Sequence, residues 1–224
     1  MPLLVEHSLP LWGIWKIEES SDELLKLLEN KQPYYSFVTD TMTEARKREW
    51  LASRVLVKRL LGFEPDISYT DAGAPFLVGL SKRISISHTK GFAAVILSDN
   101  PAAGIDIEYM SDRVKKIRTR FMSASEDSQI DAHYETEHLL VYWSAKETLF
   151  KMIGQSDVDF KEHLQIHPFR YSNEGVFLAT ERRTKKNESF KIHFFVHVSS
   201  SLPFSHRSPF FKLLYLFFLR VVLF

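Results

Sequence analysis

The sequence predicts an α+β protein built as two halves. After an N-terminal strand region, its patterns run in the order helix, strands, helix, strands, and the two series meet at residues 99–101 (D-N-P). An Asn-Pro step favours a turn, so we place the link between the halves there. The predicted division is 1–100, 101–200 and an apolar tail at 201–224. With 224 residues and 45% hydrophobic content, the chain can bury one large core or two small ones.

The N-terminal half opens with a strand region at 3–17 and a helix that runs from Ser20 to Leu28. Ser20, followed by acidic residues, provides the cap that begins this helix. A long amphipathic helix is predicted at 43–61, and Gly62 stops it. Short strands separated by Gly and Pro turns then follow at 68–69, 76–78, 84–87 and 92–98.

The C-terminal half begins with a strand at 104–108 (G-I-D-I-E) and continues with a basic helix or loop at 112–121. Residues 131–154 are predicted to be mostly helical. Strands return at 164–169, 176–181 and 190–198.

Composition excludes several classes of protein. The net charge of +1 gives no support for a general nucleic-acid binder. The absence of cysteine excludes a disulfide framework, thiolate catalysis and Cys-ligated metals, and agrees with a reducing compartment. Residues 1–15 lack a basic stretch followed by an apolar run, so no signal peptide is predicted. We expect a cytoplasmic protein without integral membrane insertion.

Two segments carry most of the functional information. In the strand at 104–108, residues two apart share a face, so Asp106 and Glu108 lie together. In the segment 143–151 (W-S-A-K-E-T-L-F-K), residues four apart share a helix face, so Glu147 and Lys151 lie together with Lys146 one step round. Three carboxylates beside two lysines suit a hard divalent cation that holds a phosphorylated substrate.

Both segments also allow a purely structural interpretation. Each segment alone is also compatible with solvated charges or a salt-bridged helix face. A third signal favours the functional interpretation: an alternating strand, I-S-I-S-H-T at 84–89, ends in a polar cluster just before Gly91. The remaining histidines are scattered without acidic residues at matching spacing, and we interpret them as structural.

These motifs, in this order, resemble those of the 4′-phosphopantetheinyl transferase superfamily, particularly its larger branch of surfactin-synthetase-activating and enterobactin-type enzymes. The family shows S-H-[ST], then G-[IV]-D, then W-[ST]-x-K-E-[AS]-x-x-K. Three further stretches are similar to family patterns: R-K-R-E-W-L-A-S-R at 46–54, G-A-P-F-L at 73–77 and F-M-S-A-S-E at 121–126. Thr148 and Ala74 depart from the usual residues. The resemblance covers residues 46–151, nearly half of the chain.

The resemblance implies two similar α+β halves related by a pseudo-twofold, with the active site in the cleft between them. It also implies that the enzyme transfers the phosphopantetheine arm of coenzyme A to a serine of an apo acyl or peptidyl carrier protein, with Mg²⁺, and releases 3′,5′-ADP. The implied residues are, as metal ligands, Asp106, Glu108 and Glu147; as catalytic residues, Glu147, Lys146 and Lys151; and as coenzyme contacts, Arg46, Arg48, Arg54, Pro75, Ser87, His88, Lys146 and Lys151.

Partners and alternatives follow from the same comparison of patterns. Acidic carrier-protein helices would meet a basic surface, for which the candidates are Arg113, Lys115, Lys116, Arg118 and Arg120; a plain solvated segment is the alternative. The length of the chain favours the larger branch of the family that it resembles, which implies a monomer. A non-catalytic relative that binds coenzyme A or carrier protein is the alternative function.

The tail at 210–224 is predicted to be a buried strand, an interfacial helix or an altered C-terminus. The alternative of an unrelated membrane-peripheral protein depends on this tail alone.

Overall fold

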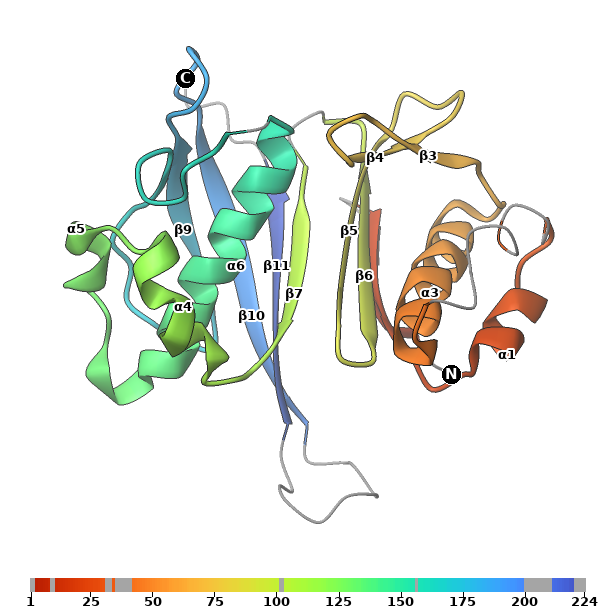
Figure 1. Ribbon diagram of the computed structural model, residues 1–224, viewed down its shortest axis with the longest axis horizontal. Coiled ribbons are helices and arrows are strands. Elements are labelled where there is room, and N and C mark those ends of the chain that lie inside the picture. The colour runs from red at the N-terminus through yellow and green to blue at the C-terminus, as the bar shows by residue number, and fades with distance from the viewer. Residues whose placement is uncertain are drawn as a thin grey trace. The chain divides into compact units, whose positions relative to one another are not determined.

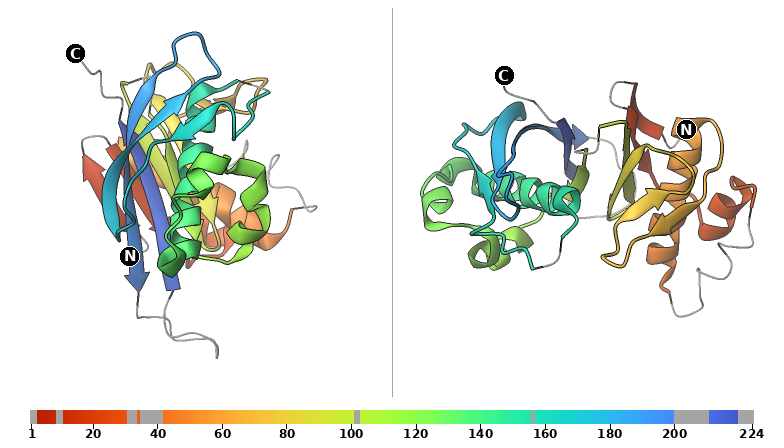
Figure 2. Two further views of the ribbon diagram at one scale, coloured as in Figure 1. Left: turned by 90° about the vertical axis from the view of Figure 1, so that its left-hand side faces the viewer. Right: turned by 90° about the horizontal axis from the view of Figure 1, so that it is seen from above.

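The computed structural model describes residues 3–8, 11–30, 34, 42–100, 103–155, 157–199 and 211–219. The chain divides into two compact units, Met1–Pro101 and Ala102–Phe224. Each is a sheet with helices on one face (Figures 1 and 2). None of the helices in these ranges is both long enough and apolar enough to cross a membrane.

The first unit holds a four-stranded antiparallel sheet in the order β1-β2-β6-β5 and a separate β3-β4 pair. Its elements are β1 (Leu3–Ser8), β2 (Leu11–Lys16), α1 (Ser21–Lys26), α3 (Glu44–Leu61), β3 (Ile67–Tyr69), β4 (Pro75–Leu77), β5 (Arg83–Thr89) and β6 (Phe92–Ser98).

Local sequence explains how the main elements of this unit begin and end. The Ser20 side chain and Glu23 form a capping box at the start of α1, and the Thr43 side chain caps α3. Gly62 ends α3 with a left-handed φ of 78°. Strand β6 is buried along its whole length, as its continuous apolar run predicts. The core forms where α1 and α3 pack on this sheet.

The second unit holds a five-stranded antiparallel sheet in the order β7-β11-β10-β9-β8. Its elements are β7 (Ile105–Tyr109), α4 (Arg113–Phe121), α5 (Ala124–Asp127), the 3₁₀ turn η1 (Ala132–Tyr134), α6 (Glu135–Ile153), β8 (Leu164–Ile166), β9 (Glu174–Glu181), β10 (Ser189–Ser199) and β11 (Phe211–Leu219).

Helix α6 lies along one face of this sheet and packs on β7, β8, β9 and β11 (Figure 1). The core joins α6 to the inward residues of β8, β9 and β10, including Leu164, Phe177 and Phe194. Residues 211–219, for which a strand was one of the predicted alternatives, pair as a strand between β7 and β10. The predicted strand at 164–169 is shorter, because only Leu164–Ile166 pair with β9. The pseudo-twofold relation between the units stays a prediction.

Candidate functional site

An acidic cluster lies where β7 meets α6 in the second unit. Asp106 is 3% exposed, accepts a hydrogen bond from the Ser144 hydroxyl at 2.5 Å and pairs with Lys151 Nζ at 2.6 Å. Glu108 accepts a hydrogen bond from Trp143 Nε1 at 2.9 Å. The three partners come from one helix, so α6 orients both carboxylates that β7 presents.

Close packing of the strand on the helix explains the glycine that precedes this acidic pair. A Cβ atom at Gly104 would lie 2.9 Å from Met152 Cγ and 3.1 Å from Thr148 Cγ2. Real Cβ atoms do not approach so closely, and a side chain here would push β7 away from α6. The glycine therefore lets the carboxylates of β7 reach the helix.

The carboxylates of the cluster influence one another. Burial, together with the charge of Asp106, raises the pKa of Glu108 to about 7. Burial and Asp106 also raise the pKa of Glu147, while Lys151 opposes the shift. Three carboxylates therefore share one ammonium group. Oxygen ligands of this kind suit Mg²⁺, yet the described residues contain no ready-made group of three His, Asp or Glu ligands around one point. That Asp106, Glu108 and Glu147 together hold a metal ion stays a prediction.

Lys146 is placed differently from the sequence prediction. Its side chain is fully buried and its ammonium donates to Glu126 at 2.7 Å, to the Phe121 carbonyl at 2.7 Å and to the Phe160 carbonyl at 2.8 Å. All three N–H donors are used inside the unit. Helix geometry explains this placement. Lys146 follows Ser144 by two residues on α6, which rotates it by more than half a turn and directs it away from the helix face that carries Ser144. These contacts give Lys146 a structural role in the second unit.

Glu126 is a residue that sequence analysis did not assign to the site. It is 2% exposed, and besides Lys146 it binds the Ser123 amide and hydroxyl and the Ile166 amide. The signal was present, because Ser123 and Glu126 match a capping box. Trp143 packs against Phe121 and also donates to Glu108. Ser144 was likewise missed, although it lies inside the W-S-A-K-E stretch.

A second polar cluster lies in the first unit, where α3 passes the end of β5. His88 Nδ1 lies 3.1 Å from Glu49 Oε2, and His88 Nε2 lies 2.5 Å from Arg46 Nη1. The Arg46 side chain is 48% exposed. A guanidinium beside an imidazole suits the oxygens of a phosphate. The structure thus brings together Arg46 and His88, which are 42 residues apart in the sequence.

The other two predicted arginines lie elsewhere. Arg48 donates to the Ile17 carbonyl at 2.9 Å, on another side of α3. Arg54 is 4% exposed, stacks on the Trp50 ring with its Cζ 3.6 Å from the ring centroid, and donates to the Tyr69 hydroxyl. Both guanidinium groups are engaged inside the first unit. The prediction that they contact a coenzyme phosphate is therefore not supported by their placement.

Ser87 and Pro75 complete the predicted set. Ser87 is 6% exposed and precedes His88 on β5, so the two side chains point to opposite faces of the strand. Pro75 is half-buried at the start of β4, opposite Tyr69 in the β3-β4 pair.

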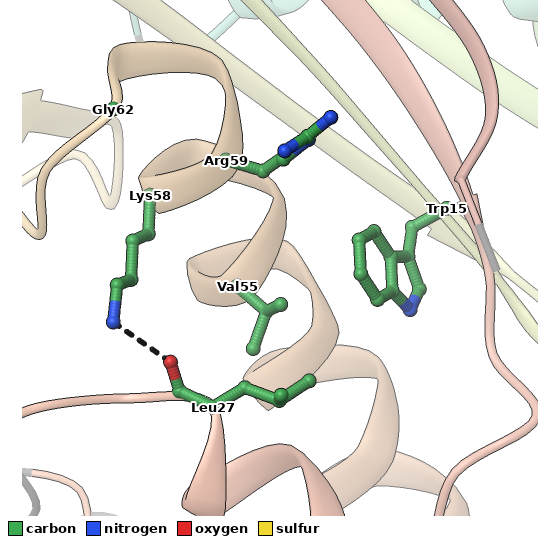
Figure 3. A pocket seen from close by; sticks show the side chains of 6 residues that line it. All are labelled: Trp15, Leu27, Val55, Lys58, Arg59 and Gly62. Atoms are coloured by element: carbon green, nitrogen blue, oxygen red, sulfur yellow. Dashed lines mark hydrogen bonds between the residues drawn. The ribbon is translucent and has the colours of Figure 1, made fainter. Parts of the chain in front are cut away.

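A cavity of about 330 Å³ also lies in the first unit, lined by Trp15, Leu27, Val55, Lys58, Arg59 and Gly62 (Figure 3). The Lys58 ammonium is occupied there by the Leu27 carbonyl at 2.9 Å and by Glu29 at 3.0 Å. At 1.5 Å per helical residue, its part of α3 lies roughly 18 Å from Arg46. The cavity is therefore distinct from the cluster around His88.

Comparison with known proteins identifies the family. A model of the 4′-phosphopantetheinyl transferase superfamily matches residues 102–203. The 4′-phosphopantetheinyl transferase AcpT of Escherichia coli K12 is 30% identical over 145 residues, which are 60% of this chain and 74% of that protein. The chain belongs to the 4′-phosphopantetheinyl transferase superfamily.

The AcpT proteins of Salmonella typhimurium and Salmonella typhi are each 31% identical over 117 residues, half of this chain. The match spans 61% of the length of each of these relatives. The segment matched by the phosphopantetheinyl transferase model contains the whole β7–α6 cluster, while Arg46, Glu49 and His88 lie outside it.

Proposed function

We propose that this protein transfers the 4′-phosphopantetheine arm of coenzyme A to a serine of an apo acyl or peptidyl carrier protein and releases 3′,5′-ADP. The observation that carries the proposal is the cluster of Asp106, Glu108, Glu147 and Lys151, which lies within the family-matched segment. The AcpT relatives are named as 4′-phosphopantetheinyl transferases, which supports the proposal.

The reaction requires a base near the attacking hydroxyl. The serine Oγ attacks the phosphorus that bears pantetheine, the bond from that phosphorus to the bridging oxygen breaks, and 3′,5′-ADP leaves with the oxygen. We assign Glu147 to accept the serine proton, directly or through water. Burial and Asp106 raise the pKa of Glu147, and this makes its carboxylate a better proton acceptor near neutral pH.

The cluster also fits a divalent cation in charge and in ligand chemistry. The Lys151 ammonium acts on three carboxylates, and burial, together with the charge of Asp106, raises the pKa of Glu108 to about 7. We propose that Asp106, Glu108 and Glu147 hold Mg²⁺, which when bound would neutralise pyrophosphate charge. We expect the Lys151 ammonium to leave Asp106 and to bind a phosphate oxygen when the substrate binds.

The first unit contributes Arg46 and His88 to the proposed binding of a coenzyme A phosphate. Both side chains are partly exposed, and together they provide a cationic donor and an imidazole. We keep Pro75 as an expected contact. Arg48, Arg54, Ser87 and Lys146 are left out, because their polar groups are engaged or buried elsewhere.

Helix α4 supports a docking surface for an acidic carrier protein. Its five basic residues divide into two groups: Lys115 and Arg118 are paired with Asp112, Asp127 and Glu135. Arg113, Lys116 and Arg120 are exposed and spaced three and four apart, so they share one face of the helix. We propose that this face meets an acidic helix of the carrier.

The test is a transfer assay. Purified protein is incubated with coenzyme A, Mg²⁺ and an apo carrier protein, and the intact mass of the carrier is followed. We expect a gain of one phosphopantetheine arm that requires Mg²⁺, is lost in Glu147→Gln and is kept in the exposed control Glu162→Gln. Coenzyme A binding without transfer across several carriers would instead indicate a non-catalytic relative. Light scattering checks the expected monomer, and cell fractionation checks the expected cytoplasmic location.

A further inference from the structure

Glu49 has no role in the reaction proposed above, yet it contacts His88, which is proposed to bind a phosphate of coenzyme A. Its side chain is 18% exposed and lies between the first turns of α3 and the end of β5. Its Oε2 atom lies 3.1 Å from His88 Nδ1 and 4.0 Å from Arg46 Nη1. One carboxylate therefore contacts both the His88 imidazole and the Arg46 guanidinium.

The contacts of His88 determine which ring nitrogen carries its proton. A guanidinium only donates hydrogen bonds, so His88 Nε2, 2.5 Å from Arg46, must accept. Nδ1 then carries the hydrogen and donates it to Glu49. With Arg46 in this position, the imidazole is neutral, and both of its nitrogens have fixed partners.

We propose that Glu49 is a positioning residue that prepares His88 to receive a phosphate of coenzyme A. The proposal rests on the proposed function. When a phosphate draws Arg46 away, Nε2 faces the anion and must be protonated to donate to it. A carboxylate on Nδ1 holds the ring in place and stabilises the imidazolium that forms. The ring thus takes up one proton as the phosphate binds.

The charges around His88 support this order of events. Within the described part of the chain, α3 brings the charged side chains of Arg46 and Glu49 to His88, and the register partner of His88 on β6 is the uncharged Ala93. Before binding, the three side chains carry no net charge, and after proton uptake they carry one positive charge. The Glu49 carboxylate is 18% exposed, and this burial raises its pKa while Arg46 opposes the shift.

The first test measures coenzyme A binding by titration calorimetry in two buffers of different ionisation enthalpy. We expect wild-type protein to take up a proton on binding. Glu49→Gln keeps the shape of the side chain but loses its charge. We expect it to bind coenzyme A about tenfold more weakly, because a fall of one unit in the pKa of His88 corresponds to a tenfold loss of affinity. We also expect it to take up little of the proton. Glu49→Asp should restore part of both. Glu44→Gln, an equal loss of charge in the first turn of α3, should change neither.

The second test does not depend on coenzyme A. Nuclear magnetic resonance of the imidazole nitrogens should show the Nδ1–H form of His88, assigned among the nine histidines by its loss in His88→Asn. In Glu49→Gln, His88 should gain its proton about one pH unit lower than in wild type. An unchanged titration of His88, or unchanged coenzyme affinity in folded Glu49→Gln beside a weakened His88→Asn, would overturn the proposal. If wild type binds no coenzyme, the proposed function fails, and the titration still decides whether Glu49 controls His88.

Discussion

Replacing Lys146 by Met should unfold the second unit more readily, and the contacts of Lys146 allow the size of the effect to be worked out. The substitution keeps the volume of the side chain but removes an ammonium that is fully buried against Glu126. Glu126, itself 2% exposed, would be left as a buried carboxylate without a cation. The carbonyls of Phe121 and Phe160 would lose a donor as well.

Removing one partner of a buried ion pair costs about 3–5 kcal/mol. Amide donors from Ser123 and Ile166 remain on Glu126 and keep the expected loss near the lower end, about 3 kcal/mol. For a chain of this size, that corresponds to a fall of roughly 6–12 °C in the melting temperature. The double variant Lys146→Met/Glu126→Gln removes the stranded charge, so we expect it to recover about half of the loss.

Urea unfolding measures these differences as shifts of the midpoint at constant slope. Lys161→Met, an exposed lysine, serves as the matched control and should stay within about 0.5 kcal/mol of wild type. A loss below about 1 kcal/mol in Lys146→Met, accompanied by much weaker coenzyme A binding, would refute the structural role. It would return Lys146 to the phosphate contact that the sequence motif predicts.

Three further outcomes are expected. Gly104→Ala brings a methyl group against Met152, and should cost about 1–3 kcal/mol in urea unfolding and reduce transfer. The pKa of Glu108 rises from 4.5 to about 7, so the folded state holds this proton more tightly; with EDTA present, stability should fall as pH rises between these values, and Glu108→Gln should flatten that slope. Lys116→Glu should raise KM for the carrier protein several-fold, with an effect that fades at high salt, whereas the exposed control Lys185→Glu should not.

Much of the fold follows from local signals in the sequence. The helix predicted at 43–61 is Glu44–Leu61, because Thr43 and Gly62 cap it through their own side chain and backbone. The strand predicted at 92–98 is observed with the same bounds. The ends of short strands such as Leu164–Ile166 could not be predicted, since pairing with β9 decides them.

For the candidate site too, local patterns predicted some placements, whereas contacts between distant residues decided others. Period-two alternation correctly places Asp106 and Glu108 on one strand beside α6. The burial of Lys146 and Arg54 could not be predicted, because it depends on Glu126 and on Tyr69, which contact them only in the folded chain. A motif identifies residue types at a spacing, whereas the neighbours of each side chain decide whether a charge meets a ligand or the protein interior.

Residues 211–219, whose structure the sequence did not decide, affect the orientation of the acidic cluster. Strand β7 lies at one edge of its sheet, and within the described residues its partner strand is β11, with Leu216 opposite Asp106 and Leu214 opposite Glu108. A slip of one residue in this pairing would turn both carboxylates to the other face, away from Ser144 and Trp143. Helix α6 supplies the partners of the carboxylates, but the register with β11 determines that they face it. The apolar residues 211–219 therefore act on the chemistry of the proposed site through backbone pairing, although no motif of the family includes them.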